Sequence, residues 1–217
     1  MRTLLAMAAM ALLCACNVVT TKAPLFVKAD AEHGAKLRPG VWAAQPSGDC
    51  ALDEKQPLPS WPNCANGFVV VDDGTIAGYE QKDGKPVWST TEALVAGGDP
   101  LIFQIHLVSD TSMGAMTPEG YIYAGMEPTK RDAQGRVVAT TSWAVVCGPP
   151  PPADTKAPNG DPRMGTLKPF DGLIMDAQGN DCTTDSKEVL RAAAKASHKI
   201  TPAEQLSAMH WVRDGKE

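Results

Sequence analysis

Hydrophobic positions occur in short runs of strand length, separated by turn-forming residues, along most of this chain. The runs at 67–71 and 75–79 flank Asp72-Asp73-Gly74, which predicts a β-hairpin. A second turn of the same kind follows at 82–85, and 101–108 is a mostly apolar run of strand length. The pattern predicts a β-rich domain.

Further strands are expected next to two identical Asp-Ala-Gln-Gly tetrapeptides. The first tetrapeptide, 132–135, separates the runs 121–124 and 136–146, and suits a type I turn that ends on a left-handed glycine. The second, 176–179, follows an expected strand at 173–175. The run 40–43 opens the domain after a proline.

Helical patterns occur only near the C-terminus. The stretch 185–198 is rich in Ala, Leu and Lys, as a helix favours. Thr201-Pro202-Ala203-Glu204 has the form of a capping box and predicts a second short helix through about residue 209, before a closing strand at 210–213. The expected fold is mainly β with C-terminal helices (α+β): one domain over 39–217, a small sandwich or barrel of about eight strands with one or two short helices, stapled by disulfides.

The N-terminus has the features of an export signal. Arg2 supplies a positive charge, and the apolar stretch from Leu4 to Leu13 is far shorter than the roughly 20 residues that cross a bilayer as a helix. This stretch runs into Leu13-Cys14-Ala15-Cys16, which resembles the lipobox of bacterial lipoproteins. An ordinary secretory signal with a chance cysteine is the alternative.

The resemblance implies that 1–15 is a removed signal peptide and that Cys16 becomes the lipid-carrying first residue of the mature chain. Cys14 is a poor acceptor because bulky Leu13 precedes it. Asn17, rather than Asp, at the second mature position implies sorting to the bacterial outer membrane, facing either the periplasm or the cell surface. The segment 16–38 is expected to be a lipidated tether, in which the apolar patch 25–27 is either a first strand or a docking segment.

The charge balance excludes some partners. The chain carries a net charge of −5, and removal of Arg2 with the signal leaves −6. Because phosphate binding needs clustered Lys and Arg, no nucleic-acid partner is expected. The same negative charge argues against a second, electrostatic attachment to anionic lipid.

Four cysteines remain besides Cys14 and Cys16, and an even number in an exported chain favours disulfides. Three pairings are possible. The sequence-local one, Cys50–Cys64 and Cys147–Cys182, is favoured because each pair brackets a loop rich in Pro or Gly. Metal binding, the rival use of these cysteines, lacks Cys-x-x-Cys and His-x-x-x-His spacings. The proline-rich stretch 148–162 is interpreted as a surface loop under the second disulfide, or else as a rigid arm.

Aromatic residues provide the clearest candidate for a contact surface. Trp61 lies in the loop expected under the Cys50–Cys64 disulfide, where a rigid loop presenting an aromatic ring is a common recognition device. Trp42, Trp88 and Trp143 lie on expected strands and are assigned to the core, while Trp211 neighbours His210.

No catalytic, metal or cofactor motif is found. His106 lies inside an apolar strand, where a structural role is the favoured interpretation, and the remaining histidines lie in the tether, at a helix end and beside Trp211: His33, His198 and His210. The pairs Asp72-Asp73 and Asn180-Asp181 lack the spacing of calcium loops and suit turns.

Three functions are consistent with these features. The first is a non-catalytic binding or structural module, held to the membrane by its N-terminal lipid, with an envelope protein as partner. The second is a periplasmic hydrolase that uses His106 or a carboxylate. The third is a lipocalin-like carrier of an apolar ligand. The absence of a catalytic constellation favours the first.

Overall fold

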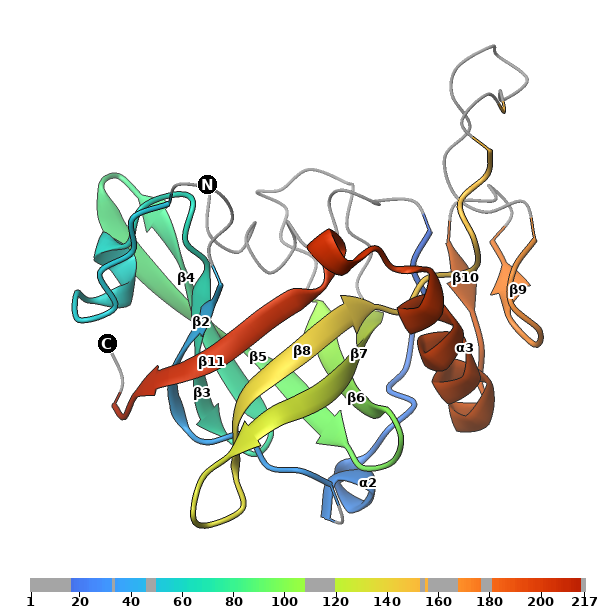
Figure 1. The fold of residues 1–217 in the computed structure, drawn as a ribbon, viewed down its shortest axis with the longest axis horizontal. Coiled ribbons are helices and arrows are strands. Elements are labelled where there is room, and N and C mark those ends of the chain that lie inside the picture. The colour runs from blue at the N-terminus through green and yellow to red at the C-terminus, as the bar shows by residue number, and fades with distance from the viewer. Residues whose placement is uncertain are drawn as a thin grey trace.

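The strands form a closed eight-stranded antiparallel barrel in the computed structural model, which describes residues 17–32, 34–45, 50–107, 120–152, 155, 168–176 and 181–215 (Figure 1). Seven strands follow one another around the barrel, and the last strand of the chain closes it between β2 and β8. The barrel strands are β2 (Gly40–Ala44), β3 (Gly67–Asp72), β4 (Thr75–Lys82), β5 (Lys85–Ala96), β6 (Leu101–Leu107), β7 (Gly120–Arg131), β8 (Val137–Ala144) and β11 (Ser207–Arg213).

The other elements lie outside the barrel wall. They are β1 (Thr20–Thr21), α2 (Lys28–Glu32), η1 (Leu58–Ser60), β9 (Ile174–Met175), β10 (Cys182–Thr183), α3 (Lys187–Ile200) and η3 (Ala203–Gln205). β1 pairs with the first residues of β7, and β9 pairs with β10 in a small separate sheet. The mainly β fold with a C-terminal helix is the fold expected from the sequence.

Turn chemistry accounts for the hairpins. Asp83 and Gly84, the central residues between β4 and β5, both have positive φ, at 52° and 74°, as a two-residue hairpin turn requires. Gly135 has φ of 78° and closes the turn between β7 and β8 as expected. The second Asp-Ala-Gln-Gly, 176–179, lies largely outside the described residues.

Large apolar side chains fill the described part of the barrel interior. Trp42 and Phe68 stack with ring centroids 6.3 Å apart, and Phe103, Met126 and Val137 pack in the same cluster. An eight-stranded barrel is just wide enough for its side chains to fill. The interior is therefore a hydrophobic core.

Two further cores lie on the outside of the wall. One forms where η1 and the Cys50–Cys64 loop cover β2, β3 and β4. The other forms where α3, the N-terminal segment and the Cys147–Cys182 disulfide cover β5 to β8. The uninterrupted run Phe68-Val69-Val70 fits this arrangement, because both faces of β3 are buried.

The prediction of a tether over 16–38 is wrong for the residues of this segment that the structure describes, because they belong to the folded body. Val19 and Phe26 are buried in the outer core, and Leu37 is buried in the barrel core. The segment is held by main-chain bonds to residues more than a hundred positions away, such as Val19 N to Val145 O. The patch 25–27 docks on the barrel wall, one of the two roles left open for it.

The second C-terminal helix is present only as a short turn, and its predicted extension to about residue 209 is wrong. Thr201 ends α3, since its amide and hydroxyl both donate to the Ser197 carbonyl. Only the short η3 follows, and residues from Ser207 onward form β11. Residues 207–209 form a strand rather than a helix because β11 pairs on both edges, with β2 and with β8, and these pairings satisfy its main-chain hydrogen-bonding groups.

Candidate functional site

A cleft of about 350 Å³ opens where β8 and β11 separate at one end of the barrel. The two strands pair from Ser207 to His210, but beyond this point β11 pairs with β2 alone. There the N-terminal segment takes over the free edge of β8, as the Arg38 amide donates to the Val137 carbonyl at 2.9 Å. The cleft is lined by Arg38, Lys130, Arg131, Asp132, Val138, Ala139, His210 and Trp211.

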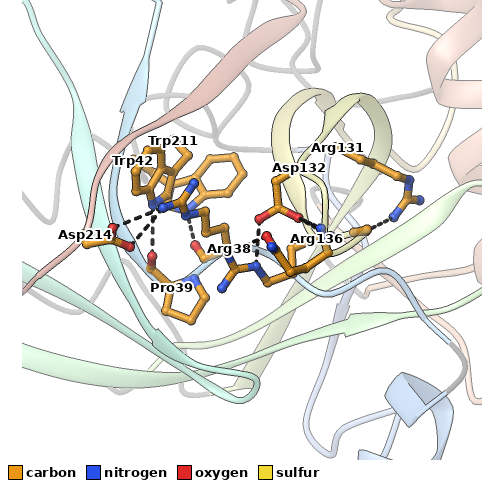
Figure 2. Close-up of polar contacts among 10 residues, drawn as sticks. Arg38, Pro39, Trp42, Arg131, Asp132, Arg136, Trp211 and Asp214 are labelled. Carbon is orange, nitrogen blue, oxygen red and sulfur yellow. Dashed lines mark hydrogen bonds and ion pairs between the residues drawn. The ribbon is translucent and has the colours of Figure 1, made fainter.

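Arg38 and Trp211 form one wall of this cleft (Figure 2). The guanidinium carbon of Arg38 lies 3.5 Å from the centre of the Trp211 ring, which is cation–π geometry. Nη2 of Arg38 also donates to Asp214 at 3.0 Å, whereas Nε is buried and has no hydrogen-bond partner. The Arg38 side chain is only 22% exposed, against 77% for Asp214. The guanidinium is therefore held by both the indole face and the exposed Asp214 carboxylate.

Two indole N–H groups fix the main chain beneath Arg38. Trp42 Nε1 donates to the Arg38 carbonyl at 2.8 Å, and Trp211 Nε1 donates to the Pro39 carbonyl at 2.9 Å. Both bonds come from barrel strands and reach the same two residues before β2 (Figure 2). This wall of the cleft is preorganised by the core.

The β7–β8 turn forms the opposite wall. Asp132 pairs with Arg136 Nε at 2.7 Å and accepts the amides of Gln134 and Arg136, and Arg131 Nη1 donates to the Gly135 carbonyl at 2.9 Å. Burial alone raises the pKa of the Asp132 carboxyl, but the Arg136 and main-chain hydrogen bonds outweigh it and hold that pKa below its usual range. The turn is thus rigid.

Cationic residues line the cleft on both walls. Lys130 and Arg131 are exposed on the hairpin, opposite Arg38 and Trp211. Arg and Trp are enriched where proteins make strong contacts, and guanidinium groups favour carboxylate or phosphate partners. The cleft is therefore suited to contact with an anionic group of a partner.

Trp61, the expected contact residue, is not on the surface. Its side chain is 6% exposed, packs with Leu58 and Tyr79 against the barrel wall, and donates from Nε1 to the Gln56 carbonyl at 2.9 Å. The expectation is wrong because the disulfide-bonded loop folds back on β3, where Gly67 leaves room for the ring. The apolar outer face of β3 was the sequence signal for this burial.

The remaining tryptophans divide between core and surface. Trp42 lies in the barrel core, and Trp143 is buried on the outer wall, where it donates to the Ala194 carbonyl of α3. Trp88 is partly exposed and tilts against Tyr79. Trp211 is the tryptophan that lines the cleft. Sequence reasoning missed this role because Arg38, which stacks on Trp211, is far away in the chain.

The histidines that the structure describes have structural partners. His106 stacks on Tyr121 at 4.6 Å, and His198 stacks on Trp143 at 4.0 Å. His210 Nε2 lies 2.8 Å from a Glu54 carboxylate oxygen at the cleft. His106 lines neither this cleft nor the hollow beside Pro39 and Gly40, and His33 lies outside the described residues.

Asp72, Asp73 and Asp181 act locally. Asp72 accepts the Gly74 amide in its turn, and Asp73 pairs with Lys36 at 2.5 Å. Asp181 accepts the Val18 amide at 3.3 Å, while Asn180 lies outside the described residues. Among the described residues, no group of three or more His, Cys, Asp or Glu side chains is arranged to bind a metal ion.

Both favoured disulfides are present, Cys50–Cys64 and Cys147–Cys182. The second lies beside the first described residues of the chain, where the carbonyl of Val18 is 3.3 Å from the sulfur of Cys147. Cys16 and the rest of the lipobox lie outside the described residues, as does most of the proline-rich loop.

No α-helix in the described part of the chain is long and apolar enough to span a bilayer. In comparisons with known proteins, no protein-family model, no curated protein and no solved structure matches this chain.

Proposed function

We propose that this chain is an exported bacterial lipoprotein, anchored through Cys16 in the outer membrane, whose barrel is a non-catalytic binding module for another envelope component. The observation that carries the proposal is the sequence Leu13-Cys14-Ala15-Cys16, which ends one residue before the folded body begins at Asn17. Two or more acyl chains on one cysteine hold a protein stably at a membrane.

The disulfides support an exported location. All four cysteines that follow Cys16 are paired. Disulfides persist in oxidising compartments such as the bacterial periplasm and are rare in the cytosol. A domain crosslinked by two disulfides is therefore consistent with a location in the bacterial cell envelope.

The filled core and the cleft support binding on the outside of the barrel. Because Trp42, Phe68 and Phe103 occupy the interior, contact with a partner falls to the outer surface. The Arg38–Trp211 cleft is the best candidate there, since it joins a preorganised aromatic ring to several cations in a protein of net negative charge. An acidic segment of an envelope protein is the partner that fits.

The anchor is tested by intact-mass analysis of the membrane-extracted protein. The expected mass is that of residues 16–217 plus a diacylglyceryl group and an N-acyl chain, and the Cys16→Ser variant should carry neither. An unmodified mature N-terminus in the parent protein would contradict the anchor.

The partner is tested by photo-crosslinking in membranes. A photoreactive residue in place of Lys130, at the cleft, should capture a partner, whereas one in place of exposed Lys85 on β5 should not. Replacing both Arg38 and Trp211 by Ala should lower capture at least tenfold, about 1.4 kcal/mol or more. Equal capture from both positions, or capture unaffected by these replacements, would exclude the cleft.

A carrier of an apolar ligand is the second candidate, because the closed eight-stranded barrel is compatible with one. A fluorescent fatty acid should then bind with 1:1 stoichiometry, and Ala124→Phe, which adds bulk beside the barrel core, should weaken it. Absence of saturable binding would remove this candidate.

A further inference from the structure

No linker residues separate Cys16 from the folded body, because Asn17 already belongs to that body. Asn17 is 7% exposed; its Nδ2 donates to the Gly148 carbonyl at 3.0 Å, and its own carbonyl accepts the Cys147 amide at 2.9 Å. The next residue, Val18, accepts the Cys182 amide and donates to Asp181. Residues 17–19 are therefore hydrogen-bonded both to the segment that contains Cys147 and to the segment that contains Cys182, its disulfide partner.

The peptide bond restricts where residue 16 attaches. Successive Cα atoms are about 3.8 Å apart, so the acylated cysteine is held within one residue of the Asn17–Gly148 contact. A tether of n flexible residues spans about 5–6 Å times the square root of n, and here n is zero. The bilayer surface must therefore lie close to this end of the barrel, which we call the anchor end and define by Asn17, Gly148 and Asp181.

The cleft lies at the other end of the same strand. Arg38 is bonded to Val137, where β8 begins, whereas Asn17 is bonded to Cys147, just beyond the end of β8. The ten residue-to-residue steps from Val137 to Cys147 correspond to about 33 Å of extended chain at roughly 3.3 Å per step. Figure 1 shows β8 running between these ends, from the β7–β8 turn at the bottom toward α3 and β10.

One exposed side chain adds an apolar contact near the anchor end. Ile174, on β9, is 66% exposed. It pairs with Thr183 of β10, the strand that Val19 also contacts. Aliphatic side chains are stabilised when they insert at the boundary between lipid headgroups and acyl chains.

We infer that the barrel docks directly on the bilayer by its anchor end and holds the Arg38–Trp211 cleft at the opposite end of β8, facing the aqueous compartment. The inference rests on the proposed lipid at Cys16, and it names the lipid surface as the partner of the anchor end. The partner of the cleft then approaches from the aqueous side.

The test measures energy transfer to a headgroup acceptor dye in vesicles of phosphatidylethanolamine and phosphatidylglycerol. The lipidated protein carries one donor dye, either at Pro150→Cys beside the anchor end or at Ala133→Cys in the β7–β8 turn; both positions are exposed. Matching denaturation midpoints establish that both labelled chains are folded with their disulfides closed.

The expected result is at least twofold higher transfer from position 150 than from position 133. Inserting Asn followed by ten Gly-Ser residues between Cys16 and Asn17 keeps Asn at the second mature position and should make the two efficiencies similar. Equal transfer without the insert, in protein whose mass includes the lipid, would overturn the docking and leave the anchor intact. A parent protein without lipid on Cys16 would overturn both.

Discussion

Gln104 holds Phe26 by both of that residue's main-chain polar atoms. Its Oε1 accepts the Phe26 amide at 2.9 Å, and its Nε2 donates to the Phe26 carbonyl at 3.0 Å. The amide side chain thus substitutes for a neighbouring strand on the outer wall of the barrel. This contact fastens the N-terminal segment between the anchor end and the cleft.

Replacing Gln104 by Leu should lower the free energy of unfolding by about 2–3 kcal/mol, because it leaves a buried amide and a buried carbonyl of Phe26 without partners. Urea denaturation gives the magnitude, and hydrogen exchange should be accelerated at the Phe26 amide. Gln205→Leu, at an exposed position on η3, is the control and should be nearly neutral. Equal effects of the two changes would rule out the role of Gln104.

A side chain at position 125 should destabilise the barrel. Gly125 pairs with Trp143 across β7 and β8, and a Cβ at 125 would overlap the indole ring of Trp143. Gly125→Ala should therefore lower stability by about 1–3 kcal/mol, the usual effect of overpacking. Gly78→Ala on β4 is the matched control, because a Cβ there meets nothing within 4 Å. Thermal denaturation of both variants decides; an unchanged midpoint for Gly125→Ala would contradict the packing.

The two disulfides should differ in their contribution to stability. They close loops of 14 and 35 residues. By the chain-entropy relation these loops correspond to about 3 and about 4 kcal/mol. Replacing Cys147 and Cys182 by Ser should therefore be the more destabilising change, and it should also loosen residues 17–19. Guanidinium denaturation of the two double variants compares them, and the reverse order would contradict the prediction.

Two aspartates should give opposite pH dependence of stability. Burial raises the pKa of Asp181 above the usual 3.8, so its ionised form opposes folding as the pH rises through that pKa. Asp181→Asn should therefore stabilise the protein at neutral pH, with a gain that disappears below about pH 3.8.

Asp30 provides the matched comparison. Burial alone would raise the pKa of Asp30, but the Lys187 ion pair at 2.7 Å and the Val27 amide lower it below 3.8. The ionised Asp30 carboxylate therefore stabilises the folded state above pH 3.8, and this stabilisation is lost as the pH falls through the lowered pKa. Asp30→Asn should destabilise at neutral pH. Denaturation midpoints from pH 3 to 7 test both variants, and effects of the same sign would contradict the assignment.

Turn chemistry made much of the barrel predictable from the sequence. The Asp-Gly pairs at 73–74 and 83–84 predicted two hairpins, and the short apolar runs beside them marked the strands. The sequence-local cysteine pairs were predictable for a similar reason, since each closes a short loop.

The long-range contacts were not predictable in this way. Phe26 meets Gln104, and Arg38 meets Trp211, across separations of 78 and 173 residues. Nothing in the local pattern around Phe26 indicates a polar partner on a distant strand. The cleft was missed for the same reason, because its walls come from three separate parts of the chain.

The position of β11 sets the time at which the barrel can form. It is the last strand of the chain, and it is the strand that joins β2 to β8. Until Ser207–Arg213 has been synthesised and delivered, both of those strands present open edges, which readily pair with other chains. Under the proposed export through a narrow translocation channel, the barrel would therefore close only after nearly all of the chain has crossed.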